Sequence, residues 1–516
     1  MKFHSRSLAL QISLFATGCS GIVAEFVLST LATYLIGNAT FQWTMIMSIM
    51  LFAMGLGSRL SRYFKTDLFD TFVLVEFLLS CLCALSAVIS FGLSVQIESN
   101  EIVIYPLAFF IGTLIGLEIP IVTRINSEYQ ELRANISSVL EMDYFGSLLG
   151  GVAFAFLFLP YLGFSYTPVL LGSINFIVAS WLLWSFFNLT RLKKTLIFSF
   201  AICFAVIGCA AFFAKDMILF SEQKKYKDTI IYSKQTRYQK IVMTRWKKYY
   251  WLYINGQEQF STYDEERYHE PLVHPAMELA SSHSNILILG GGDGLAAREI
   301  FKYRDVKSLT LVDLDPVMTD LAKNFPVLQK INSNSMSDKR IHIINMDGSA
   351  FLDKTEKLFN LVFIDLPDPD SMDLMHLYSY SLYENIKRHL ARGGIMVTQA
   401  TSPFFANKAF LCIDKTIKAA GFSTLPYHNQ VPTLGEWGWI LAVNDRDLSE
   451  DKLKNLALHL KFNDIKTKFI NHDAMISMIY FGKETFNKNI MDKLRINTEA
   501  DPVLYKYYQQ GSWGIY

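Results

Sequence analysis

The chain has 516 residues, of which 51% are hydrophobic and only 18% are charged. A soluble globular protein usually carries about 25% charged residues, so this composition excludes a chain that is water-soluble throughout. Forty-eight basic residues against 47 acidic ones leave a formal net charge of +1, and no basic excess points to a nucleic-acid partner.

Long apolar runs are concentrated before residue 215. Each run of about 20 residues is long enough to cross a hydrocarbon core about 30 Å thick. The first run follows a basic start, but it is far longer than the core of a cleaved signal peptide. We therefore predict an all-α polytopic membrane domain over residues 1–214. Its seven expected helices lie at 8–36, 41–60, 71–95, 102–123, 139–160, 166–188 and 195–214.

Basic residues between these spans indicate the orientation, because Lys and Arg accumulate in short cytoplasmic loops. They follow the second, fourth and sixth spans only: Arg59, Arg62, Lys65, Arg124, Arg133, Arg191, Lys193 and Lys194. This pattern puts the amino terminus in the cytoplasm, and seven crossings would then put everything after residue 214 outside. Lysines just after the last span (Lys215, Lys224, Lys225, Lys227) favour the opposite orientation, which one re-entrant span would allow.

Acidic residues lie within or at the edges of the apolar spans: Glu25, Glu76, Glu118, Glu141 and Asp143. An unpaired charge there costs at least about 2.5 kcal/mol, so each is a candidate functional residue that would suit a cation. The alternatives are an interfacial position, protonation or a polar partner. Glycines in the same spans favour close helix packing over a substrate path: Gly112, Gly116, Gly146, Gly150 and Gly151.

The pattern changes to a soluble α/β type after residue 215. Residues 229–262 are rich in Tyr, Thr, Ile and Val with partial alternation, which predicts a small antiparallel β domain over 215–275. Five apolar runs then alternate with helical patterns: NILIL, SLTLVDL, IHIINM, LVFIDL and GGIMVTQ. This alternation predicts an α/β Rossmann-like doubly wound domain, similar to class I methyltransferases, over 276–445. Residues 446–516 form a C-terminal extension.

Acidic residues follow four of the expected parallel strands. The first strand runs into a glycine-rich turn, 290–294, that contains Asp293. Asp313 closes the next strand, where a carboxylate commonly accepts ribose hydroxyls. Asp347 follows the third strand, and Asp365 and Asp368 follow the fourth. Carboxylates that converge on one sheet edge repel each other unless cations bind, so we expect cationic ligands.

These motifs, in this order, resemble the spermidine synthases, or polyamine aminopropyltransferases, over about 230–445. The matching segments are Tyr238-Gln239, Gln259, 264–270 (DEERYHE), 290–294 (GGGDG), Asp313, Asp347-Gly348, 365–369 (DLPDP), Gln399 and 435–439 (GEWGW). The membrane-spanning amino-terminal half resembles a bacterial subgroup that carries such a fusion.

The resemblance implies transfer of an aminopropyl group from decarboxylated S-adenosylmethionine, a co-substrate and not a tightly bound cofactor, to putrescine. The products would be spermidine and 5'-methylthioadenosine. By the same resemblance, Asp365 is the catalytic carboxylate, and Tyr268, His269 and Asp368 bind the amine. The co-substrate residues would be Gln239, Gln259, Asp293, Asp313, Asp347 and Gly348. An acid at 293 would also repel the carboxylate of S-adenosylmethionine itself.

One departure leaves the acceptor open. Many soluble relatives carry a tyrosine and a proline after a Pro-Thr pair, whereas this chain has Pro432-Thr433-Leu434-Gly435. Putrescine is expected, with cadaverine or spermidine as alternatives.

Two other functions remain to be weighed. A membrane-tethered S-adenosylmethionine-dependent methyltransferase is disfavoured by Asp293 and by the pair Asp365 and Asp368. A non-enzymatic polyamine transporter or sensor is disfavoured by the joint presence of these acids with Tyr268 and Gln259.

The expected partners are the amine, the lipid bilayer and further copies of the chain, as a dimer or tetramer. No His/Cys cluster indicates a metal. We expect a multi-pass protein of the cell (inner) membrane. Its catalytic domain is expected to be cytoplasmic, because the co-substrate is a cytosolic metabolite.

Overall fold

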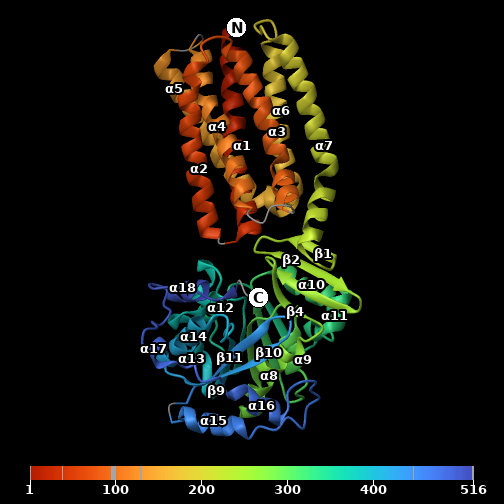
Figure 1. Cartoon of the computed structure of the whole chain (residues 1–516), viewed down its shortest axis with the longest axis vertical. Coiled ribbons are helices and arrows are strands. Elements are labelled where there is room, and N and C mark those ends of the chain that lie inside the picture. Colours follow the sequence, from red (N-terminus) through yellow and green to blue (C-terminus); the bar gives the residue numbers. More distant parts are fainter. Residues whose placement is uncertain are drawn as a thin grey trace. The chain divides into compact units, whose positions relative to one another are not determined.

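The computed structural model describes residues 2–37, 39–94, 100–127, 129, 131–445 and 447–513. Contacts divide the chain into two compact units, Met1–Thr229 and Ile230–Tyr516 (Figure 1). The finer division into four parts at 214, 275 and 445 stays a prediction.

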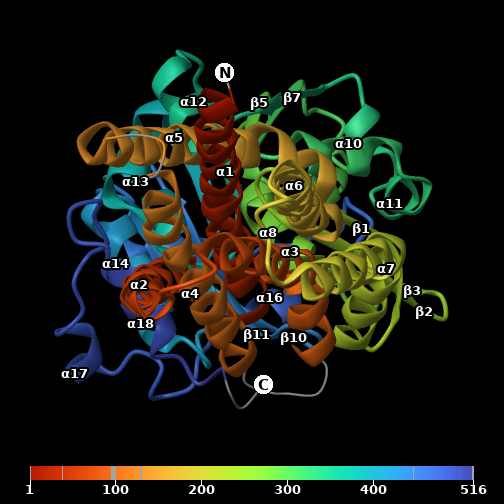
Figure 2. The ribbon, with the colours of Figure 1, turned by 90° about the horizontal axis from the view of Figure 1, so that it is seen from above.

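In the described part of the first unit, seven long helices run side by side (Figures 1 and 2). Among the described residues, six uninterrupted helical segments are long and apolar enough to cross a membrane, and one of them, Leu132–Ser185, contains both α5 and α6. The helices are α1 (Lys2–Ile36), α2 (Ala39–Leu60), α3 (Leu68–Ser94), α4 (Glu101–Asn126), α5 (Leu132–Ala153), α6 (Gly163–Ser185) and α7 (Lys193–Lys225), with a 3₁₀ turn η1 (Ser61–Tyr63) and a π-helix η2 (Phe154–Leu162).

Helices α5 and α6 are two separate helices of opposite direction, because the chain reverses direction between them. Residues later in α5 contact residues later in α1, so these two helices run in the same direction. Residues later in α6 contact residues earlier in α1, so these two run in opposite directions. The reversal follows η2 at Gly163, whose φ of 60° lies in the left-handed region. The pairs are Gly146–Phe15 and Gly150–Cys19 for α5, and Phe164–Tyr34 and Asn175–Ser20 for α6. The predicted seven helices are therefore confirmed.

Glycines bring the helix backbones of this unit close together. A Cβ atom at Gly116 would overlap the backbone of Met54 in α2, and one at Gly146 would overlap the backbone of α1. These contacts confirm the predicted packing role of the two glycines.

The acidic residues of the spans divide into two groups. Glu25, Glu76 and Glu118 are buried among the helices, whereas Glu141 is exposed and Asp143 is half-buried. Neither carboxyl oxygen of Glu76 has a hydrogen-bond partner among the described residues. Their function stays a prediction.

The second unit begins with a four-stranded antiparallel sheet in the order β1-β2-β3-β4, which confirms the predicted strands after residue 229. The strands are β1 (Thr229–Gln235), β2 (Lys240–Trp246), β3 (Tyr249–Ile254) and β4 (Gln257–Ser261). Helix α8 (Glu266–Leu279) follows and connects this sheet to the larger one.

A seven-stranded mixed sheet forms the rest of this unit, in the order β10-β11-β9-β8-β5-β6-β7. The five predicted runs are its parallel strands, so the Rossmann-like prediction is confirmed. Strands β10 and β11 form an antiparallel edge that the sequence pattern did not predict. The strands are β5 (Asn285–Gly290), β6 (Ser308–Asp313), β7 (Ile341–Asn345), β8 (Phe359–Asp365), β9 (Leu390–Gln399), β10 (Ser423–Val431) and β11 (Gly435–Val443).

Apolar clusters cover both faces of this sheet. Successive residues of a strand point to opposite faces, so each strand contributes to both clusters. In β5, Ile286 and Ile288 belong to one apolar cluster, and Leu287 and Leu289 belong to another. The helices and 3₁₀ turns of this unit after α8 are α9 (Leu295–Ile300), α10 (Pro316–Asn324), α11 (Pro326–Ile331), η3 (Ser335–Ser337), α12 (Gly348–Lys354), η4 (Met372–Tyr378), α13 (Tyr380–His389), α14 (Asn407–Ala419), α15 (Glu450–Leu458), α16 (His472–Ile479), α17 (Lys488–Met491) and α18 (Val503–Gln509).

The C-terminal extension contributes to both clusters. Met475 of α16 is buried in the first cluster, and Leu504 of α18 is buried in the second. The extension is therefore part of the folded core of the second unit.

Candidate active site

The glycine-rich turn after β5 joins three strand ends. The amide of Gly291 donates to the carbonyl of Asp365 at 3.0 Å. A Cβ atom at Gly290, whose φ is 83°, would overlap that same carbonyl, and one at Gly292 would overlap the carboxylate of Asp313. Only glycine lets the backbone approach both neighbouring strands this closely.

Two carboxyl groups beside this turn are held by backbone amides. Asp293 accepts from the amide of Leu295 at 2.8 Å, and Asp313 accepts from the amide of Asp315 at 2.9 Å. Burial raises the pKa of Asp293 to about 6, although the nearby positive charge of His269 opposes the rise. Burial likewise raises the pKa of Asp313 to about 6. Both groups are thus poised to gain from a cationic ligand.

Asp365 lies at the end of β8 and accepts a hydrogen bond from the hydroxyl of Tyr268 at 2.8 Å. Burial raises the pKa of Asp365, while His269 and this hydroxyl oppose the rise. The ring of Tyr268 is buried and packs on Trp439 with ring centroids 5.5 Å apart. The structure brings these two residues together, although they are 97 positions apart in the chain.

His269 is held by a buried ion network. Its Nδ1 lies 3.1 Å from a carboxylate oxygen of Glu265, which also accepts two hydrogen bonds from Arg298 at 2.8 Å. Burial favours the neutral imidazole, but Glu265 outweighs it and raises the pKa of His269 to about 9. His269 is therefore a cation near Asp293 and Asp365. Its predicted contact with the amine stays a prediction.

Asp368 follows β8 and is almost fully buried. Its Oδ2 accepts from Thr401 at 3.2 Å and from Tyr508 at 2.9 Å, whereas its Oδ1 has no partner among the described residues. Burial raises the pKa of Asp368 to about 7. A buried carboxylate oxygen without a donor is costly, and a ligand that donates there would remove this cost.

The residues expected around the co-substrate lie on or next to strands of both sheets. Gln239 donates to Asp315 at 3.0 Å, which places it next to the Asp313 loop. Asp347 caps helix α12 through the amide of Ala350 at 2.9 Å, with Gly348 as the first residue of that helix. Its hydrogen bond with His376, 3.2 Å long, lowers the pKa of Asp347. Gln259 lies on β4 and donates to the carbonyl of Gln257 at 3.3 Å, and its ligand contact stays a prediction.

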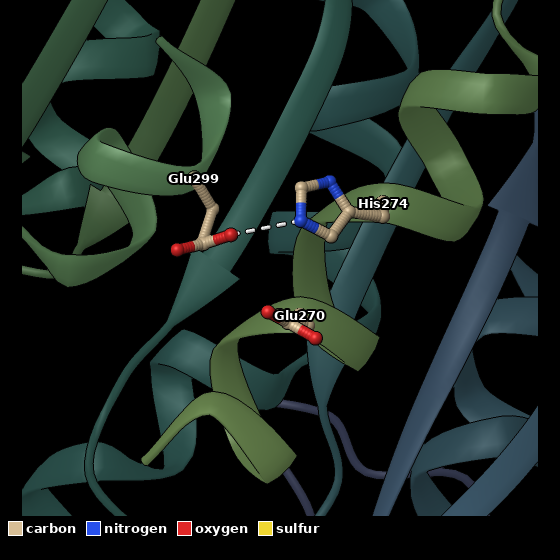
Figure 3. Close-up of side chains that lie close together, drawn as sticks. All are labelled: Glu270, His274 and Glu299. Carbon is tan, nitrogen blue, oxygen red and sulfur yellow. Dashed lines mark hydrogen bonds and ion pairs between the residues drawn. The ribbon is translucent and has the colours of Figure 1, made fainter. Parts of the chain in front are cut away.

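A second cluster of titratable groups lies away from these strand ends (Figure 3). Glu270 and His274 of α8 converge with Glu299 of α9, and the Nε2 of His274 donates to the carboxylate of Glu299 at 2.8 Å. Glu270 accepts three backbone amides, from 468, 469 and 470, at 2.7, 2.8 and 2.8 Å. The ammonium of Lys302 contacts both glutamates. Lys302 thus supplies a positive charge to both glutamates, and Glu270 fastens the C-terminal extension to α8.

Sequence reasoning missed four residues that the structure adds to the site: Arg298, Asp315, Thr401 and Tyr508. Asp315 had a visible signal, because an Asp before a Pro is typical of a helix start, and it caps α10. Thr401 has a φ of 57°, a strained conformation that the sequence did not indicate. Tyr508 is 140 residues from Asp368 and had no local signal.

Comparison with known proteins identifies relatives along nearly the whole chain. Residues 265–455 match the spermine/spermidine synthase domain family. Polyamine aminopropyltransferase 2 of Aquifex aeolicus is 43% identical over 505 residues, which cover 98% of this chain and 99% of that protein. The polyamine aminopropyltransferase of Oceanobacillus iheyensis is 37% identical over 503 residues, 96% of each protein. That of Leptospira interrogans is 39% identical over 438 residues, 84% of this chain and 87% of that one.

Solved structures are similar over about half of this chain. A spermidine synthase in complex with the transition-state analogue AdoDATO and the spermidine synthase from Thermotoga maritima each cover 51% of this chain and 87% of their own. Both have a TM-score of 0.45, with sequence identities of 23% and 22%.

Proposed function

Because the chain belongs to the polyamine aminopropyltransferase family, we propose that it transfers the aminopropyl group of decarboxylated S-adenosylmethionine to putrescine. One observation carries this proposal for the site. Asp368, which is buried, and Asp293 and Asp365, which are half-buried, are carboxyl groups with raised pKa values at one edge of the sheet. Substrates with a sulfonium and several ammonium groups supply the positive charges that such an edge lacks.

The transfer requires no covalent enzyme intermediate. A neutral amine nitrogen attacks the aminopropyl carbon next to sulfur, the new C–N bond forms, and the C–S electron pair returns to sulfur. The products are spermidine and uncharged 5'-methylthioadenosine, with one proton released from the nitrogen. We assign acceptance of that proton to Asp365, because Tyr268 engages only one of its oxygens.

Asp293 is the proposed discriminator between co-substrates. Its carboxylate lies in the turn where the aminopropyl chain would end, so it would attract an ammonium and repel the carboxylate of S-adenosylmethionine. At an effective dielectric of about 20, one like-charge contact near 4 Å costs about 4 kcal/mol. Asp313, Asp347 and Gly348 are the proposed contacts of the adenosine part, and Gln239 and Gln259 are the proposed contacts of the sulfonium and the aminopropyl chain.

The amine would be held between two carboxylates. Asp365 faces the reacting nitrogen, and Asp368 receives the far ammonium at its unpartnered Oδ1. The preferred diamine length is part of this proposal, with putrescine as the expected acceptor.

Turnover by the detergent-purified full chain tests the proposal. Decarboxylated S-adenosylmethionine is offered with putrescine, cadaverine and spermidine, and release of 5'-methylthioadenosine is followed for wild type and Asp365→Asn. We expect amine-dependent release that falls at least about 100-fold in the variant, the usual size of a lost general base. Absence of release by wild type with all three amines, while the co-substrate still binds, would favour the sensor or transporter alternative. Methyl transfer from S-adenosylmethionine would favour the methyltransferase.

We also propose that α1–α7 anchor the enzyme in the cell membrane with its catalytic unit in the cytoplasm. Cytosolic synthesis of the co-substrate and the basic residues after the last span support this side, whereas the basic loops at the other end of the helices oppose it. Lys224→Cys, in a chain with the exposed Cys209 replaced by Ser, tests it. A membrane-impermeant thiol reagent should label this position in lysed cells only. Labelling of intact cells would place the catalytic unit outside.

We propose that the chain assembles as a homo-oligomer, a dimer or tetramer, through its catalytic unit. Light scattering of the purified protein, corrected for bound detergent, measures the number of chains. A single chain per particle at micromolar concentration would contradict this assembly.

A further inference from the structure

The C-terminal segment after residue 455 lies outside the matched synthase domain but reaches its site. Helix α18 packs against η4, which follows β8 and Asp368. Asn497 fastens this segment, because its side-chain amide donates to the carbonyls of Met375 and Tyr378, both at 3.0 Å. Its side-chain oxygen accepts from the amide of Leu504 at 3.3 Å. The position of α18 is therefore fixed by polar contacts with η4.

Tyr508 is the residue of α18 that reaches the site. Its side chain is buried, and its ring packs on Trp513 with centroids 4.9 Å apart. Trp513 in turn stacks on Phe405, with centroids 5.7 Å apart. These contacts hold the hydroxyl of Tyr508 at 2.9 Å from Oδ2 of Asp368.

Two donors on one oxygen leave the other oxygen of Asp368 for a ligand. Thr401, whose φ of 57° lies in the left-handed region, also donates to Oδ2, at 3.2 Å. Oδ1 is buried and has no partner among the described residues. A carboxylate clamped in this way cannot rotate freely, so the position of Oδ1 relative to Asp365 is set.

We propose that Tyr508 is a specificity-determining residue of the amine site: by fixing Asp368, it sets the spacing between the two carboxylates that hold the two ends of the diamine. The inference rests on the proposed aminopropyl transfer and adds to it the C-terminal extension as a part of the site. Tyr508 positions Asp368 and takes no part in the bond changes. Its loss would therefore weaken the choice between diamines that differ by one methylene.

Tyr508→Phe tests this inference in the full-length, detergent-purified protein. The variant keeps the ring and its packing and loses only the hydroxyl. Tyr505→Phe on the same helix is the matched control, because the side chains that donate to Oδ2 of Asp368 among the described residues are those of Thr401 and Tyr508. For Tyr508→Phe we expect the KM for putrescine to rise about ten-fold, the effect of one hydrogen bond to a charged group. The KM for decarboxylated S-adenosylmethionine should not change.

Selectivity is the decisive readout. The ratio of kcat/KM for putrescine to that for cadaverine should move toward one in Tyr508→Phe and stay at the wild-type value in Tyr505→Phe. An unchanged ratio, or equal loss for both amines and for the co-substrate, would overturn the inference. Binding of the co-substrate to each variant, measured by calorimetry, shows that the variant is folded. Wild-type protein that transfers no aminopropyl group at all would contradict the proposed function instead.

Discussion

Asp368 predicts a specific pH dependence for amine binding. Burial raises its pKa to about 7, so the carboxyl is neutral below this pH and charged above it. With a pKa near 7, about nine-tenths of the molecules carry the charge at pH 8 and about one-tenth at pH 6. The diamine stays doubly protonated outside the site across this range. Its KM should therefore rise roughly ten-fold as the pH falls from 8 to 6.

The assay measures initial rates of 5'-methylthioadenosine release at several putrescine concentrations and half-unit steps of pH. The co-substrate is kept saturating, because Asp293 and Asp313 have pKa values of about 6 and affect its binding over an overlapping range. Asp368→Asn is the control, and its KM for putrescine should be high and nearly flat. A wild-type KM that stays constant between pH 8 and pH 6, or a variant that keeps the wild-type slope, would refute this reasoning.

The carboxyl group of Asp368 also predicts a pH dependence of stability. Rising pH strengthens amine binding but lowers the free energy of unfolding. The folded chain binds the proton of Asp368 more tightly than the unfolded chain, so stability falls as the pH rises from about 4 to about 7. A shift of about three units corresponds to an upper limit of roughly 4 kcal/mol. Asp368→Asn should melt at a higher temperature than wild type at pH 8, with a smaller difference at pH 5. Equal melting temperatures at pH 8 would show that burial of the Asp368 carboxylate does not lower the stability of the folded chain.

Three further changes test the turn and the ion networks. Gly292→Ala should raise the KM for the co-substrate at least about ten-fold, because the new Cβ displaces the Asp313 carboxylate, whereas Gly208→Ala, which meets no atom within 4 Å, should match wild type. Glu270→Gln should lower the free energy of unfolding by about 3 kcal/mol, because one amide oxygen cannot replace a charged acceptor of three backbone amides. Turnover in the presence of EDTA should equal turnover without it. A loss of turnover in EDTA that added zinc restores would indicate a metal site at Glu270. Arg298→Met should destabilise the chain by about 3–5 kcal/mol, since it leaves a buried carboxylate with one cation fewer, and unchanged melting would contradict the network.

The acids at the strand ends could be predicted from the sequence because parallel strands end at a common edge. Once the five apolar runs are read as parallel strands, Asp313 and Asp365 must come near the glycine turn between them. The structure brings both to that turn. The amino-terminal helices could also be predicted, because length and apolar character alone decide whether a segment can span a bilayer. The helices depend on local pattern, and the meeting of the strand-end acids depends on the rule that parallel strands end at a common edge.

Other features depended on contacts between distant segments. Strands β10 and β11 form one edge of the sheet, and β11 pairs with the side of β9 that β8 leaves free. Tyr508 meets Asp368 across 140 residues, and Glu270 meets Ile470 across 200. Such pairs leave no periodic signal, because the path of the chain and the packing of the core bring them together. The sequence alone therefore determined the kind of sheet, the glycine turn and the acids, while the tertiary structure decided which donors clamp Asp368 and leave one of its oxygens open.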